Sequence, residues 1–335
     1  MNKKIIVILF LTLFLTGCTK TLVDKDNKPI RYEAIHLCEK CEEVCVDKKE
    51  ECLNKCKYDC DDYKKNETGQ ALTENILCKP TNEDVIKIYQ KYGVKVEKLP
   101  ECKKFKLSDG NYEGLWNIFF VKPLAWLILK LGNFVNNYGL SLIIISILIR
   151  FALMPVTKST ALQSENIKKA QPEIEKIEKK YEGKTDQDSV MKKSQETMLL
   201  YKKYNINPMS SCLFALIQIP LLFAFIEAIN RTPAIFEESF LGLNLGMTPS
   251  IALQKGFWWY IIIVIILGVI TYLSFKLNKG ASSSLDNQKQ MNIMNTVFVV
   301  MIIFMSFSMT TAVSLYWISS NIFTIIQNVI VMKRG

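Results

Sequence analysis

Histidine is almost absent from this chain of 335 residues, which contains His36 and no other. Histidine is the side chain that most often acts as a general acid or base near neutral pH, so its scarcity argues against acid–base catalysis. The sequence also lacks a glycine-rich phosphate loop and a nucleophile with a basic partner. We therefore expect a protein that is not an enzyme and that has no catalytic residues, cofactor or metal.

Aspartate is missing from the long apolar segments of the chain, which are numerous. Hydrophobic residues make up 49% of the sequence, the mean hydropathy is +0.13, and the charged residues gather in blocks between the apolar segments. Five segments approach the roughly 20 residues that a helix needs to cross a bilayer: 139–157, 209–228, 257–275, 293–309 and 311–331. They predict an all-α polytopic membrane protein with a five-helix transmembrane bundle in a core at 137–335.

The amino terminus has the features of a secretory signal. Lys3 and Lys4 precede a short apolar run at 5–15, and Leu15-Thr16-Gly17-Cys18 resembles the lipobox of bacterial lipoproteins. This pattern predicts a signal peptide at 1–17, lipidation of Cys18 and an extracytoplasmic location for the residues that follow. An uncleaved membrane anchor is the alternative, and it gives the same location.

Cysteines are concentrated in the polar segment 18–113, which holds Cys18 and eight of the nine other cysteines. Six of the eight have helical spacing on two runs joined by a polar turn, which predicts a helical hairpin closed by disulfides. A zinc cluster is the weaker alternative, because no second C-x2-C motif is present. The pairs we expect are Cys45 with Cys52, Cys41 with Cys56, Cys38 with Cys60 and, as the remaining pair, Cys78 with Cys102.

The segment 114–136 is apolar and aromatic, but charges and a proline interrupt it. Lys122, Pro123 and Lys130 make it a poor spanning helix, and Trp116 and Trp126 are typical of the headgroup region. We expect an interfacial amphipathic helix along the outer leaflet.

Lysine and arginine are distributed unequally among the loops. The loop 158–207 has eleven lysines, whereas Arg231 and Lys255 are the cations of the loop between the second and third spans. By the positive-inside rule, the amino terminus lies outside, held by the lipid anchor, and the carboxyl terminus lies in the cytoplasm. The expected location is the cell membrane.

The loop 158–207 has the pattern of a helical hairpin in the cytoplasm. One helix would place Ile167, Ala170, Ile174, Ile177 and Tyr181 on a single face, and the other would use Ser194, Met198 and Tyr201. Gly183 ends the first helix, and Asp186 or Asp188 caps the second. The hairpin is either a solvated spacer or a docking site for a ribosome or targeting factor.

Arg150 lies within the first span, roughly 16 Å along the helix from Gly139. A charge at that depth costs about 3 to 17 kcal/mol in hydrocarbon. The spans contain no aspartate, and their single glutamate, Glu227, is at the outer end of the second span. We therefore expect a hydrated cavity around Arg150; hydrogen bonds to helix carbonyls are the alternative.

Polar residues on other spans complete this interior. Ser146 and Thr157 share the stripe of Arg150, and Gln218 lies on the second span. Each residue alone is more typical of helix packing, but together they favour a wet interior. The last span has the longest polar stripe, with Ser314, Trp317, Asn321, Thr324 and Asn328 at alternating spacings of three and four.

Four motifs resemble the YidC/Oxa/Alb membrane protein insertases, in the five-span lipoprotein form of Gram-positive bacteria: "PLAWLILKLGNFVNNYGLSLIIISILIRFALMPVT" (123–157), "YNINPMSSCLFALIQIPLLFAFIEAI" (204–229), "FLGLNLG" (240–246) and "LYWISSNIFTIIQN" (315–328). The resemblance implies that Arg150 lies in a hydrophilic substrate groove, lined also by Tyr316 and Trp317. Ser274 stands where many members have a glutamine. The segment 19–113 matches nothing in the family pattern.

The resemblance implies an insertase that moves nascent membrane proteins into the bilayer through the groove. It works alone or with the Sec translocon, and a ribosome, the signal recognition particle pathway and membrane lipids are the other expected partners, without direct reading of nucleic acid. A small-solute transporter and a membrane assembly scaffold are the alternatives. A transporter would be expected to have inverted repeats with paired broken helices, which the sequence lacks.

Overall fold

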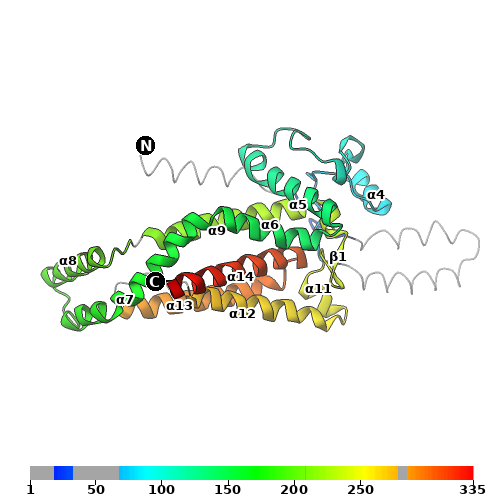
Figure 1. Cartoon of the computed structure of the whole chain (residues 1–335). Helices are drawn as coiled ribbons and strands as arrows, with labels where there is room; N and C mark the ends of the chain where they lie inside the picture. Colours follow the sequence, from blue (N-terminus) through cyan, green and yellow to red (C-terminus); the bar gives the residue numbers. More distant parts are fainter. Residues whose placement is uncertain (1–18, 33–67, 208, 278–284, 335) are drawn as a thin grey trace, which may run out of the picture. The chain divides into compact units, whose positions relative to one another are not determined.

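The computed structural model describes residues 19–32, 68–207, 209–277 and 285–334 (Figure 1). The predicted signal peptide with Cys18 and the predicted cysteine hairpin with its three disulfides lie outside these residues. The chain divides into two compact units. The first comprises residues 1–145, 220–265 and 305–317, and the second comprises 146–219, 266–304 and 318–335.

The N-terminal lobe, which we define as residues 19–32 and 68–113, has a hydrophobic core of its own within the first unit. Short backbone bridges join Thr21 to Thr73 and Arg31 to Ala71. The described part of this segment therefore buries apolar side chains in addition to its cysteines. The buried residues are Leu22, Ile30, Tyr32, Leu72, Ile76, Val85, Ile88, Tyr89 and Val96, joined by Phe236.

Two short helical turns and one helix complete the lobe: α4 (Glu83–Lys91), η1 (Val96–Lys98) and η2 (Cys102–Lys104). Val85, Ile88 and Tyr89 repeat at helical spacing, which is why α4 turns one face into the core. The predicted disulfide between Cys78 and Cys102 is confirmed, with a Cα–Cα distance of 4.8 Å. It fixes η2 against the strand-like segment that contains Cys78.

The rest of the first unit begins with η3 (Asn117–Val121) and α5 (Lys122–Val135). Asn136 ends α5 in the left-handed conformation, a helix stop that asparagine tolerates. Two small elements follow later in the chain, α10 (Pro233–Phe236) and a hairpin of β1 (Ser239–Phe240) with β2 (Leu243–Asn244). The φ of +77° at Gly242 in the hairpin turn favours glycine.

The long apolar helices are α6 (Tyr138–Ala152), α9 (Met209–Asn230), α12 (Ile261–Leu277), α13 (Leu285–Ser306) and α14 (Thr311–Arg334); the short α11 (Pro249–Gln254) and η4 (Trp258–Tyr260) precede α12. Among the described residues, three helical segments are long and apolar enough to cross a membrane: Asn117–Val135, Trp258–Leu277 and Thr311–Ile330. The apolar parts of α6, α9 and α13 are shorter. The chain is thus mostly helical, whereas five spans stay a prediction.

The first predicted span ends earlier than expected. α6 stops at Ala152, and α7 (Met154–Lys180) begins two residues later, with Pro155 in its first turn. Proline is tolerated there because the first turn of a helix needs no backbone N–H donor. Thr157 therefore belongs to α7 rather than to the helix of Arg150, so the predicted boundary at 157 is wrong.

A helical hairpin is confirmed in the second unit, where α7 and α8 (Gln187–Lys203) lie side by side (Figure 1). Gly183 follows the end of α7 with a φ of +74°, and Asp186 caps α8 by accepting a hydrogen bond from the Ser189 backbone N–H at 2.8 Å. The predicted face of α7 is correct, since Ile167, Ala170 and Ile174 are buried.

The predicted face of α8 is correct at Tyr201, which packs against the hairpin core, but wrong at its other two residues. Ser194 and Met198 point away from the hairpin core, with Met198 59% exposed, and Leu200 is buried in their place. The helical spacing of Ser194, Met198 and Tyr201 led to the prediction of a stripe next to the one that is buried. Aliphatic side chains occur on both stripes of α8, so periodicity alone did not separate them.

Two ion pairs bridge α7 and α8 and predict a pH dependence. Glu173 accepts from Lys203 at 2.7 Å, and Glu196 accepts from Lys180 at 2.6 Å. These bonds lower the pKa of both carboxyls. Because the carboxyl pKa values are lower in the folded hairpin than in the unfolded chain, the ion pairs stabilise the hairpin fully at a pH above the unfolded-state pKa. This stabilisation is lost as the pH falls through the folded-state pKa. Amide hydrogen exchange in α8, corrected for intrinsic rates, should accelerate modestly under acid conditions.

The variant E173Q/E196Q should show this faster exchange at neutral pH already and should lose the acid effect. Glu165→Gln is the matched control, because Glu165 pairs with Lys169 on the same helix and does not bridge the hairpin. Equal exchange in the double variant and the wild type would contradict the prediction.

Candidate functional site

Arg150 is buried in the second unit, with 3% of the side chain exposed. It lies in the last turn of α6, and Ser146, one turn earlier, is buried too. The four-residue spacing puts both side chains on one helix face, as the sequence predicts. The guanidinium is thus enclosed by protein.

Two neutral oxygens hold the guanidinium. The Arg150 Nε donates to the Ser320 Oγ of α14 at 2.6 Å, and Nη2 donates to the Gln218 Oε1 of α9. The planar fork of arginine makes such a two-sided contact, which fixes the orientation of the charge. Both of these partners are side chains.

A second polar contact lies in the same unit. The Thr157 Oγ1 and the amide of Gln327 are within hydrogen-bond distance, with Gln327 Nε2 2.9 Å from the hydroxyl oxygen. Thr157 is at the start of α7, and Gln327 is on α14. Along α14, Thr324 lies between Ser320 and Gln327, and its hydroxyl donates to the Ser320 backbone carbonyl at 3.0 Å.

The remaining predicted groove residues are all buried. Asn321 on α14 and Ser274 on α12 belong to the second unit. Tyr316 and Trp317 belong to the first unit, where Tyr316 stacks on Phe225 with ring centroids 3.9 Å apart. The structure therefore brings Arg150 together with Gln218, and it places Tyr316 in an aromatic stack.

Sequence reasoning missed Ser320 and Gln327, the partners of Arg150 and Thr157. Both residues precede an asparagine of the predicted stripe, so α14 has two adjacent polar stripes. The second one runs from Ser320 to Gln327, shares Thr324 with the predicted stripe, and was visible in the sequence as spacings of four and three. Nothing in the periodicity indicated which stripe would meet Arg150.

Arg231 is the other missed residue, because it was counted as a loop charge. In the structure it directly follows α9 and is 1% exposed. Its Nη1 lies 3.1 Å from Glu227, and its Nη2 lies 2.6 Å from Glu113. Its Nε donates to the Asn75 backbone carbonyl at 2.6 Å, which ties the N-terminal lobe to the end of α9. The four-residue spacing from Glu227 was the available signal.

Trp116 belongs to this cluster instead of facing the headgroups. Its indole N–H donates to the second carboxylate oxygen of Glu227 at 3.0 Å, and its ring stacks on Phe120. Trp126 on α5 keeps a partly exposed side chain. The two tryptophans of the segment therefore have different surroundings.

These clusters are held together by hydrogen bonds and ion pairs. Within the described residues, no group of three or more histidine, cysteine, aspartate or glutamate side chains is arranged to hold a metal ion. A family model described as "60Kd inner membrane protein" matches residues 130–335. The chain belongs to this family. Arg150 and all its contacts described above lie within the matched residues.

Relatives of this member of the 60Kd inner membrane protein family come from Gram-positive bacteria. "Membrane protein insertase YidC" of Oceanobacillus iheyensis is 36% identical over 228 residues, which cover 67% of this chain and 86% of the relative. "Membrane protein insertase MisCA" of Bacillus subtilis is 36% identical over 217 residues, with coverage of 64% and 78%. The family and the apolar helices indicate a multi-pass protein of the cell membrane.

Proposed function

We propose that this protein is a membrane protein insertase, without enzymatic activity, whose substrates are nascent membrane proteins. The observation that carries the proposal is the buried guanidinium of Arg150 held by the neutral side chains of Ser320 and Gln218. The relatives support it, because both are named membrane protein insertases and the match covers 86% and 78% of their lengths.

In this proposal, the polar side chains around Arg150 line a hydrated groove within the membrane. Water that enters between the helices would replace the contacts with Ser320 and Gln218, because water oxygens can accept the same hydrogen bonds from the guanidinium. The charge of arginine would persist, because its pKa is too high for deprotonation. Arg150 would then attract the acidic outer segment of an incoming substrate in a medium of lower dielectric constant than bulk water.

The bilayer supplies the driving force for the apolar part of the substrate. Its transmembrane segment leaves water and enters lipid along apolar helix faces, such as that of α12, where Ile262, Ile265 and Val269 are exposed. No nucleotide hydrolysis is needed for this step. A groove that shortens the polar path and an apolar exit would together suffice for single-span substrates.

The proposed arrangement in the membrane has five spans, a lipid anchor on Cys18 and the carboxyl terminus in the cytoplasm. The predicted spans and the unequal distribution of lysine support it. In this arrangement the segment 114–136 lies along the outer leaflet, and the α7–α8 hairpin is in the cytoplasm. Ribosome, signal recognition particle pathway and Sec translocon are the partners that such an arrangement would serve.

Reconstitution tests the proposed function. Full-length protein in liposomes is mixed with a radiolabelled single-span substrate, and external protease is added. We expect several-fold more protected substrate fragment than in protein-free liposomes. Solute flux without protected fragments would overturn the proposal in favour of a transporter, and neither signal would overturn it in favour of a scaffold.

A further inference from the structure

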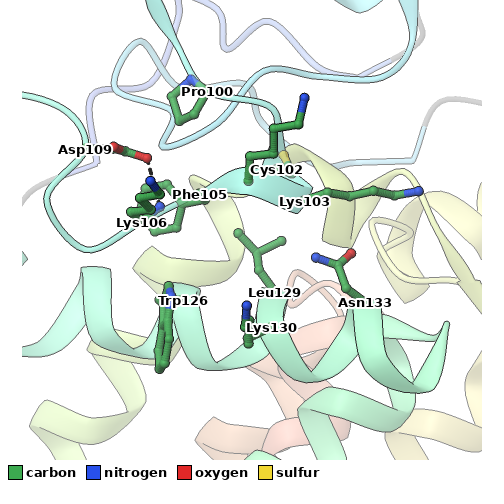
Figure 2. Close-up of a pocket in the computed structure, with 11 residues that line it drawn as sticks. Pro100, Cys102, Lys103, Phe105, Lys106, Asp109, Trp126, Leu129, Lys130 and Asn133 are labelled. Atoms are coloured by element: carbon green, nitrogen blue, oxygen red, sulfur yellow. Dashed lines mark hydrogen bonds between the residues drawn. The ribbon is translucent and has the colours of Figure 1, made fainter.

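A pocket of about 550 Å³ lies between the N-terminal lobe and α5, within the first unit. One wall is η2 with the loop that follows it, which carries Lys103, Lys104 and Lys106. The other wall is α5, from which Trp126, Lys130 and Asn133 line the pocket (Figure 2). The volume is in the range of roughly 300 to 1,000 Å³ that is typical of sites for small ligands.

The pocket is positively charged. Four lysines line it, and among its described lining residues Asp109 is the one acid. The Asp109 carboxylate already accepts a hydrogen bond from the Lys106 backbone N–H at 2.8 Å, which holds it in the loop. Lys104 pairs with Glu101, but both side chains are mostly exposed, so this pair contributes little and yields easily to a stronger anion.

The walls of the pocket are held in place before any ligand binds. The disulfide of Cys102 with Cys78 fixes η2, and the Phe105 side chain directly after η2 is buried. On the α5 side, Leu129 is buried, whereas Trp126 is partly exposed and Lys130 is exposed. A preformed site loses less conformational entropy on binding, and this strengthens the affinity for its ligand.

We propose that this pocket binds the phosphate-bearing headgroup of an anionic phospholipid. Ammonium groups from two walls would surround the phosphate as strong charge-assisted donors, with the Asn133 amide beside them. The Trp126 ring would lie at the level of the glycerol backbone, where tryptophan is favoured in membranes.

Apolar side chains around the pocket favour a lipid over a free phosphate ion. Phe134, on the turn of α5 after Lys130, is 83% exposed, and Leu107 directly follows Lys106 and is exposed as well. Each directly follows a pocket-lining residue in the chain, and in this proposal both would contact acyl chains when the lysines contact the headgroup. A soluble anion would gain nothing from these side chains, so a lipid should bind more tightly than its headgroup alone.

This inference concerns a different part of the chain from the proposed groove. The family match begins at residue 130, so the lysines of η2 and its loop lie before it. Insertion activity can fail while lipid binding persists, and the reverse also holds. The lobe would anchor the amino-terminal half of the protein to anionic lipid, beside the proposed lipid anchor.

The test is native mass spectrometry of the full-length protein in detergent, titrated with phosphatidylglycerol or phosphatidylcholine. We expect phosphatidylglycerol to bind in preference to phosphatidylcholine, and K103Q/K106Q/K130Q to weaken its binding about tenfold or more. The matched control is K25Q/K28Q/K95Q, which removes the same charge from exposed positions of the lobe outside the pocket. The control should bind as the wild type does.

Equal binding by the pocket variant and the control would overturn the proposal. The single variants Lys103→Gln and Lys130→Gln, one from each wall, are compared with the wild type in the same titration. Both side chains are exposed, so neither substitution should disturb folding. Each should weaken the binding of phosphatidylglycerol a few-fold. Glycerol phosphate and inorganic phosphate are added as competitors. Displacement of phosphatidylglycerol by either one at a similar concentration would identify a site for a soluble anion and would also overturn the proposal.

Discussion

Replacing Arg150 with glutamine is expected to reduce the insertion of single-span substrates with acidic outer tails by about tenfold or more. Glutamine keeps a polar side chain that can bond to Ser320 or Gln218, but it removes the permanent charge. A tenfold loss corresponds to about 1.4 kcal/mol, a modest value for a charge interaction at low dielectric. The measurement is the protected fragment in the liposome assay.

Arg150→Lys is the matched variant, because it keeps the charge and loses the planar fork that contacts two partners. Lysine should retain most of the activity if charge is the decisive property. Activity of the glutamine variant equal to that of the wild type would refute the electrostatic role. A substrate whose acidic tail is neutralised should respond weakly to both variants.

Replacing Arg231 with methionine is expected to destabilise the first unit by about 3 to 5 kcal/mol. Arg231 and Glu227 are both buried, so removal of the cation leaves an uncompensated carboxylate away from water. The contacts to the Asn75 carbonyl and to Glu113 are lost at the same time. The midpoint of thermal unfolding in detergent, followed by tryptophan fluorescence, is the measurement.

The double variant R231M/E227Q should recover part of this stability, because it removes the stranded charge as well. Lys98→Met serves as the control for loss of a cation at an exposed site, and it should change the stability by less than about 0.5 kcal/mol. If the single Arg231 variant unfolds at the same temperature as this control, the buried ion pair is not a source of stability.

The α7–α8 hairpin shows which buried helix faces can be predicted from hydrophobic periodicity. The spacing of Ile167, Ala170 and Ile174 predicted the buried face of α7, since burial follows helical geometry when apolar residues are few and regular. On α8 the same reasoning selected Met198, which is exposed. Local spacing does not decide between two apolar stripes of one helix; the position of the partner helix does.

The polar residues of the last span likewise show that spacing does not determine which helix face makes contacts. The stripe through Asn321 and Asn328 was found from the sequence, and these residues are buried. The contacts to Arg150 and Thr157, however, come from the residues just before these asparagines, since Ser320 meets Arg150 and Gln327 meets Thr157. The rotation of a helix about its axis depends on packing with other helices, which no single helix encodes.

The sequence by itself determined the class of protein, the apolar helices, the helical hairpin of α7 and α8 and the exceptional position of Arg150. Each follows from composition or from spacing along one segment. Only the tertiary structure decided that Ser320 and Gln218 hold Arg150 and that Arg231 is buried with Glu227. It also decided that lysines from two distant segments line one pocket. Such contacts depend on segments far apart in the chain, and local physical chemistry does not specify how these segments meet.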